Sequence, residues 1–164
     1  MLSFSGHKIY GPKGIGGLYV RSKDPRVSIE PLIFGGGQEK GLRSGTLNVP
    51  GIVGLGKAIS ILSEEMDSEN ARLISLRDTL WGLIQESIPG SILNGHPEKR
   101  SSNNLNFSNP NYKIDMALPK LQKLGFSTGS ACGSGGVKVS HVLTAMGCSV
   151  EHIEKSMRLS LGRQ

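Results

Sequence analysis

The first residues that could do chemistry form a polar turn near the N-terminus, Ser5-Gly6-His7-Lys8, which is followed by Gly11-Pro12 and Gly14. Taken alone, this turn could equally be a solvated surface turn. The glycine-rich setting adds weight to a second interpretation, because a lysine flanked by Ser and His can form a Schiff base while the two neighbours donate hydrogen bonds to a phosphate. We therefore select Lys8 as a candidate covalent residue and interpret Lys13 as a surface lysine.

A second candidate is a thiol in a segment of small residues, Ser130 to Gly136, which contains Cys132. A lone cysteine is most often a small buried hydrophobic residue. The surrounding Gly and Ser side chains could not bury a thiol, so an accessible loop is the better interpretation. An accessible thiolate is a nucleophile. Cys148 follows a predicted helix and is interpreted as structural.

Composition excludes several other classes of protein. Two cysteines are too few for a disulfide framework or a zinc site, so we expect no metal and a reduced, cytoplasmic protein. The net charge of +6 favours an acidic partner or substrate, but the 19 Lys and Arg residues are spread along the chain and nucleic-acid binding is not expected. No apolar stretch predicts a membrane span, and the glycines match neither a Walker nor a dinucleotide-binding pattern.

The elements that must position these residues begin with short β-rich segments. We expect strands at 2–6, 16–21 and 27–33, then a glycine-rich loop over 35–46. From Pro50 the spacing of apolar residues becomes helical. The apolar positions of this helix are Ile52, Leu55, Ile59 and Leu62.

The second half of the chain predicts a small unit of mixed helix and sheet. Ser68 is a plausible N-cap for a second helix, and its apolar stripe is Leu73, Leu76, Leu80 and Leu83. After Gly90 we expect the following elements in order: strands at 91–93 and 104–108, a helix at 114–123, a short strand leading to the Cys132 loop, helices at 141–146 and 151–155, and a half-buried strand at 157–161.

Four motifs in this chain resemble those of the cysteine desulfurases of the NifS/IscS group, which belong to the class V aminotransferases. They are Ser-Gly-His-Lys-Ile-Tyr-Gly-Pro-Lys-Gly at 5–14, the two glycine-loop segments at 35–39 and 43–46, Gly-Ser-Ala-Cys at 129–132, and Arg-Leu-Ser-Leu-Gly-Arg at 158–163. The motifs occur in the order that this family has, and they span almost the whole chain. The match is therefore highly specific.

The resemblance implies an α/β fold, the C-terminal part of a fold-type I pyridoxal 5'-phosphate (PLP) enzyme. On this basis 1–66 would be the end of the large PLP-binding domain with the start of a linking helix. Residues 67–164 would be the small α+β domain, truncated at its C-terminus. The missing N-terminal portion would carry the ring-stacking histidine and the aspartate on the pyridine nitrogen, and no position here can stand for them.

The resemblance also assigns roles to single residues. Lys8 would bond to PLP, Ser5 and His7 would help to bind its phosphate, and Thr46 would reach the phosphate of the neighbouring subunit in a homodimer. Arg158 would pair with the substrate carboxylate, a role that suits its planar fork, although a surface arginine on a strand is the alternative. Arg163 is interpreted as a surface residue.

The implied reaction removes sulfur from L-cysteine, giving alanine and a persulfide on Cys132, whose sulfur then passes to an iron–sulfur scaffold or another acceptor protein. One departure from the family pattern is Val137-Lys138-Val139 after the cysteine, which leaves the docking preferences of that loop open. Two alternatives also stay open. The protein could be a relative similar to selenocysteine lyases, or the chain could be a catalytically incomplete module for dimerisation or acceptor docking.

Overall fold

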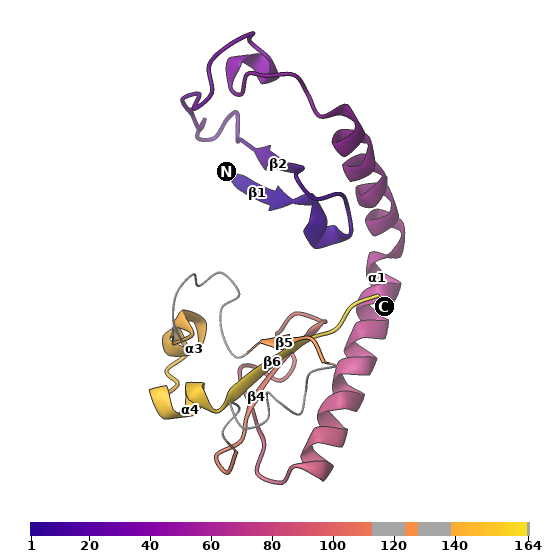
Figure 1. Ribbon diagram of the computed structural model, residues 1–164, viewed down its shortest axis with the longest axis vertical. Helices are drawn as coiled ribbons and strands as arrows, with labels where there is room; N and C mark the ends of the chain where they lie inside the picture. Colours follow the sequence, from indigo (N-terminus) through magenta and orange to yellow (C-terminus); the bar gives the residue numbers. More distant parts are fainter. Residues whose placement is uncertain (113–123, 128–138, 164) are drawn as a thin grey trace. The chain divides into compact units, whose positions relative to one another are not determined.

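The computed structural model describes residues 1–112, 124–127 and 139–163 (Figure 1). The chain divides into two compact units, Met1–Met66 and Asp67–Gln164. The helix predicted at 114–123 and the Cys132 loop lie outside the described residues.

The first unit begins with a two-stranded antiparallel sheet. Strand β1 (Leu2–Ser5) pairs with β2 (Gly16–Tyr19), and the register places Ser5 opposite Gly16. A short 3-10 helix, η1 (Gly6–Ile9), follows β1 directly. These two strands confirm the first two predicted strands, and all four residues of β1 are exposed in this chain.

The strand predicted at 27–33 is wrong. The segment is an irregular loop, and its described backbone hydrogen bonds are Val27 N to Arg21 O at 2.9 Å and Ser44 N to Ile33 O at 3.2 Å. Pro31 removes a backbone donor in the middle of the segment, which disfavours a ladder despite the β-branched neighbours. The glycine-rich loop that follows contains a 3-10 turn, η2 (Glu39–Gly41).

One long helix replaces the two that the apolar pattern predicts. Helix α1 (Val49–Ser87) runs for 39 residues, with Ser68 in its interior, so the N-cap prediction is wrong. Residues 57–81 contain neither Gly nor Pro and are rich in Ala, Leu, Glu and Arg, so nothing in the local sequence interrupts the hydrogen bonding. The boundary between the two units lies within this helix.

The glycines near the start of α1 let the N-terminal turn pack closely on it. A Cβ atom on Gly54 would lie 2.6 Å from Cγ of Pro12, and one on Gly11 would lie 3.3 Å from Cβ of Ala58. Leu55 is buried on the same helix. Gly54 is therefore a packing requirement, which outweighs its low helix propensity.

The second unit is built on a four-stranded antiparallel sheet with strand order β3-β4-β6-β5. The strands are β3 (Ile92–Leu93), β4 (Asn104–Ser108), β5 (Phe126–Ser127) and β6 (Ser156–Ser160). Two short helices, α3 (His141–Ala145) and α4 (Val150–Glu154), come before β6. Ser140 and Ser149 cap them through side-chain oxygens, as the first residues of helices commonly do. The predicted strands and helices in this region are confirmed to within one or two residues.

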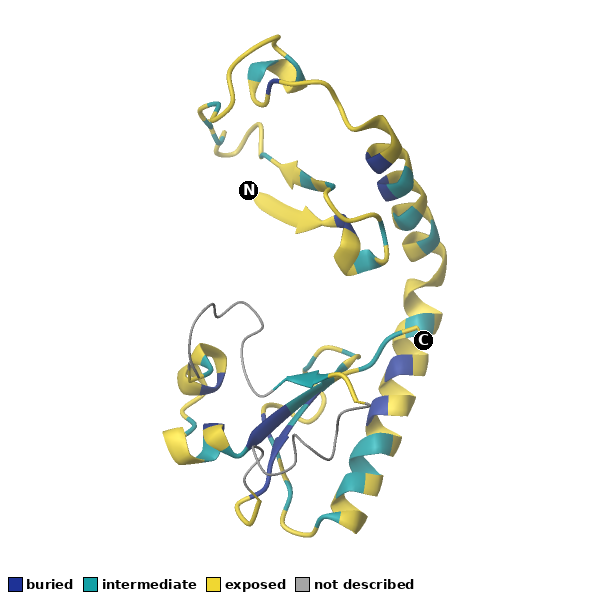
Figure 2. Ribbon diagram, in the orientation of Figure 1, coloured by how far each residue is buried: buried dark blue, intermediate teal, exposed yellow. Residues whose placement is uncertain are grey.

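The core of this unit lies between one face of the sheet and the C-terminal half of α1 (Figure 2). Leu105, Phe107 and Met157 are buried, and the Phe107 ring lies 5.9 Å from the Trp81 ring, between ring centres. The inward face of α1 differs from the predicted leucine stripe: Leu76 and Leu83 are 44% and 55% exposed. The other two predicted positions are confirmed, because Leu73 is buried and Leu80 packs against the core, where Trp81 and Ile84 join it.

Arg77 is the unexpected member of the buried helix face. Its side chain is 6% exposed, and Nη2 lies 2.8 Å from Oδ1 of Asp78 while Nη1 donates to the Ser101 carbonyl at 3.3 Å. A buried guanidinium is tolerated only when its charge is paired and its donors are used. Among the described helices, α1 included, none has the long apolar stretch that a bilayer crossing would require.

Candidate functional site

The Ser5–Lys8 turn presents three polar side chains at the junction of β1 and η1. Gly6 is buried, its N–H donates to the Ile15 carbonyl at 2.8 Å, and a Cβ there would lie 3.0 Å from that oxygen. The turn therefore closes tightly only with glycine. Ser5 makes no side-chain capping bond, and His7 and Lys8 are exposed. These side chains are available to an external group.

Thr46 lies elsewhere in the first unit. It follows a loop that is held by the Gly45 N–H donating to Oε1 of Gln38 at 3.0 Å. Thr46 is exposed and lines a cavity of about 710 Å³ together with residues of β1, β2 and α1, such as Phe4, Leu18 and Ile52. Lys8 is not among the described residues that line this cavity, and no described hydrogen bond joins Thr46 to the Ser5–Lys8 turn.

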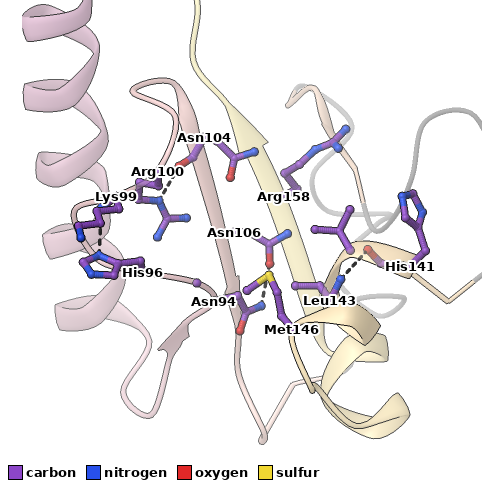
Figure 3. Close-up of a pocket in the computed structure, with 13 residues that line it drawn as sticks. Asn94, His96, Lys99, Arg100, Asn104, Asn106, His141, Leu143, Met146 and Arg158 are labelled. Carbon is purple, nitrogen blue, oxygen red and sulfur yellow. Dashed lines mark hydrogen bonds between the residues drawn. The ribbon is translucent and has the colours of Figure 1, made fainter.

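Arg158 belongs to the second unit, on strand β6. It lies opposite Asn106 of β4 and Ser127 of β5, and it is partly buried. It lines a pocket of about 640 Å³, which Figure 3 shows between β4, β6, α3 and the loop after β3. An arginine at the edge of a concave site can bind a carboxylate through two parallel hydrogen bonds.

A buried network of polar side chains fixes the wall of this pocket. Nδ2 of Asn94 donates to Oδ1 of Asn106 at 2.7 Å and to Oγ of Ser156 at 3.0 Å. Nε2 of His152 lies 2.6 Å from Oδ1 of Asn94 and 2.9 Å from Oγ of Ser108. Since an amide oxygen can only accept, this ring nitrogen carries a hydrogen.

Sequence reasoning did not select this network. One sequence pattern that indicates the network lies in β4. There Asn104, Asn106 and Ser108 alternate with apolar residues, which places a polar face opposite the core. The partners Asn94 and His152 come from distant parts of the chain, and no local pattern joins them to the strand.

The two cysteines differ in what can be described. Cys132 lies outside the described residues. Cys148 is a free thiol of intermediate exposure that follows α3, and its N–H donates to the Leu143 carbonyl at 3.0 Å. Within the described part of the chain, no group of three His, Cys, Asp or Glu side chains is arranged to hold a metal ion.

Comparison with known proteins gives one consistent family. The family model of aminotransferase class-V matches residues 1–164. The cysteine desulfurase IscS of Klebsiella pneumoniae is 50% identical over 163 residues, which are 99% of this chain and 40% of that protein. The chain thus spans about 40% of the length of such relatives, and its placement in their C-terminal part stays a prediction that rests on the order of the motifs.

Solved structures agree with the sequence relatives. A structure described as a NifS-like protein matches with a TM-score of 0.81 and 37% identity, over 97% of this chain and 40% of that one. A structure described as SspA in complex with cysteine matches with a TM-score of 0.64 and 36% identity, over 97% of this chain and 43% of that one. The α/β fold expected of a NifS-like enzyme is confirmed, and the chain belongs to the aminotransferase class-V family.

Proposed function

We propose that this chain forms part of a PLP-dependent cysteine desulfurase in which Lys8 and Cys132 are the catalytic residues. The observation that carries the proposal is the exposed Ser5–Lys8 turn, in a chain 50% identical over nearly its full length to a protein named as a cysteine desulfurase. Because the chain spans about 40% of such relatives, the activity belongs to a longer protein or assembly that includes it.

The donor set of the turn fits PLP. The Ser5 hydroxyl and the His7 imidazole would hold the phosphate, and the Lys8 amine would bond to the aldehyde carbon. The described ion pairs do not include Lys8, so no carboxylate of the described chain competes for its amine. When bound, PLP supplies an electron sink that stabilises negative charge on the α carbon of an amino acid.

The remaining steps belong to side chains of this protein. Lys8, once released by the incoming amino acid, would take the proton from the α carbon as a base and return it later as the ammonium acid. Thr46 would add a hydroxyl to the phosphate site of a neighbouring subunit.

Arg158 would bind the carboxylate of L-cysteine. Its place beside the fixed Asn106 amide supports this role, because a held neighbour limits the directions in which the guanidinium can lie. The related SspA structure is described as a complex with cysteine, which supports the same substrate here.

Cys132 would receive the sulfur. Its thiolate forms an S–S bond with the sulfur of L-cysteine while the C–S bond breaks. The electron pair of the broken bond stays with the carbon fragment, which takes up a proton and leaves as alanine. The persulfide then passes its outer sulfur to an iron–sulfur scaffold or another acceptor in the cytoplasm. The names of the relatives favour this function over a selenocysteine lyase or a non-catalytic module.

The proposal is tested by trapping the cofactor. The chain, alone and within the longer protein that contains it, is incubated with PLP and reduced with borohydride, and the modified peptide is identified by mass spectrometry. We expect the label on Lys8 and its loss in Lys8→Ala, with Lys13→Ala as the matched control that keeps the label. A label on Lys13, or unchanged labelling of Lys8→Ala, would overturn the assignment.

A further inference from the structure

The pocket that contains Arg158 carries more positive charge than one carboxylate site requires. Three of its described lining residues, Lys99, Arg100 and Arg158, are cationic, and two more are histidines. None of the described lining residues is Asp or Glu. A concave site with charges of one sign concentrates ions of the opposite sign.

Arg100 is the residue in this pocket whose bonding is incomplete. Its Nε donates to the Asn104 carbonyl at 3.2 Å, which holds the guanidinium in place. Its Nη1 is buried and has no hydrogen-bond partner among the described residues. A buried donor without an acceptor is unfavourable, and a charged one especially so. The guanidinium is therefore preformed for an acceptor that the described chain does not provide.

The electrostatic surroundings of Arg100 favour the binding of an anion beside it. Burial and the neighbouring Arg77 lower the pKa of Arg100, because both disfavour its charged form. The charge of Asp78 raises the pKa of Arg100 by less than burial and Arg77 lower it, and Asp78 makes its ion pair with Arg77 at 2.8 Å. A negatively charged ligand would stabilise the charged form of Arg100 against the effects of burial and Arg77.

The rest of the pocket indicates the kind of anion. Nδ1 of His96 accepts from the N–H groups of Glu98 and Lys99 at 3.1 and 3.0 Å, so its hydrogen is on Nε2 and the ring serves as a neutral donor. Helix α3 contributes the apolar side chains Val142, Leu143 and Met146. Figure 3 shows Arg100 beside β4 and Arg158 on β6, with Asn106 between them in this view.

We propose that this pocket binds a small organic carboxylate at Arg100, in addition to any carboxylate that Arg158 holds. The Nη atoms would bind the carboxylate and the α3 side chains would cover a short carbon chain. Since none of the described lining residues is a carboxylate that could form an ion pair with an ammonium group, simple carboxylic acids should bind better than free amino acids. This site needs neither PLP nor Cys132, so it stands or falls apart from the desulfurase function.

The test is calorimetric titration of the whole chain, without PLP, using succinate as the probe. Succinamide, which has a similar shape and no charge, and L-alanine, which carries an ammonium group, are the comparison ligands. We expect saturable binding of succinate that weakens with added salt, and little or no binding of the other two. Equal binding of succinate and succinamide would overturn the proposal.

Three variants locate the binding. Arg100→Gln should weaken succinate binding by about tenfold or more, as expected for the loss of a charge-assisted hydrogen bond. Arg26→Gln removes an exposed arginine of the other unit and should leave the affinity unchanged. If Arg158→Gln abolishes binding while Arg100→Gln leaves it unchanged, the anion is held by Arg158 alone and the proposal is wrong.

Nε of Arg100 also donates a hydrogen bond to the Asn104 carbonyl, so Arg100→Gln could unfold the second unit. Circular dichroism would detect that loss of structure. A direct measurement on the unmodified chain then decides the question. The side-chain N–H signals of Arg100 are followed by NMR during the succinate titration. We expect them to shift with the same saturation as the heat signal, and signals that stay fixed at saturation would contradict the proposal.

Discussion

Asn106 on β4 lies directly opposite Arg158 on β6, and its side-chain oxygen accepts a hydrogen bond from Asn94 at 2.7 Å. The amide of Asn94 is in turn held by His152, whose Nε2 lies 2.6 Å from its oxygen. A chain of side chains thus runs from helix α4 to the strand position beside the proposed carboxylate-binding arginine. Such a network orders the neighbours of a binding residue as well as stabilising the unit.

We expect Asn94→Ala to destabilise the chain by about 1–3 kcal/mol, because it removes the amide that donates to Asn106 and Ser156 and accepts from His152. In the proposed desulfurase that includes this chain, the same change should raise KM for L-cysteine more than it lowers kcat, since the residue acts through the neighbours of Arg158. Asn103→Ala is the matched control, because that side chain is exposed. Denaturant unfolding and steady-state kinetics check both parts, and equal effects of the two variants would contradict the role.

Two glycines in the first turns of α1 should respond in opposite directions to the same substitution. Gly54→Ala is expected to destabilise the chain by about 1–3 kcal/mol, because its Cβ would lie 2.6 Å from the Pro12 ring. Gly56→Ala meets no atom within 4 Å and should stabilise the helix by roughly 0.5–1 kcal/mol. Thermal unfolding of both variants measures the difference. A gain of stability at Gly54 would show that the turn does not pack there.

The corrected inward face of α1 gives a further test. Trp81→Ala should cost about 3–5 kcal/mol of unfolding free energy, because the ring packs on Phe107 and the rest of the core. Leu83→Ala should cost less than about 0.5 kcal/mol, since this leucine is 55% exposed. Urea titrations of the two variants decide between the faces. A larger cost for Leu83→Ala than for Trp81→Ala would show that Leu83 faces the core, as the sequence predicts.

The sequence predicts the second unit better than the first. Strand β4 lies at the predicted residues because its alternation is complete, and β6 follows the same rule. The incorrect predictions lie where two local features of the sequence favour different structures. Ser68 has the right chemistry for a cap, but it lies within an unbroken run of helix-forming residues. The segment 27–33 has β-branched residues, but Pro31 interrupts them.

The candidate site shows the same limit. The Ser5–Lys8 turn is recognisable because its residues are contiguous, and the structure presents them on one exposed turn. The hydrogen bond between His152 and Asn94 joins residues 58 positions apart, and the pairing of Arg158 with Asn106 depends on strand register. No periodicity in the sequence encodes either relationship, so both require the folded chain.

The two thiols should differ in reactivity. Cys132 lies among Gly and Ser residues that could not cover it, whereas Cys148 is partly buried beside α3. We expect iodoacetamide to modify Cys132 several times faster than Cys148 at neutral pH, because access and thiolate content set the rate. Peptide mapping after timed quenching measures both rates in one sample.

The same pair of residues tests the sulfur-accepting role in the proposed desulfurase that includes this chain. Cys132→Ser should retain PLP but form no persulfide and release no alanine from L-cysteine beyond background, because a hydroxyl oxygen cannot accept the substrate sulfur as a persulfide. Cys148→Ser is the matched control and should keep both activities. Persulfide is detected by alkylation and mass spectrometry, and alanine by amino-acid analysis. A persulfide on Cys148 in the Cys132→Ser protein, with full alanine release, would assign the acceptor role to the other thiol.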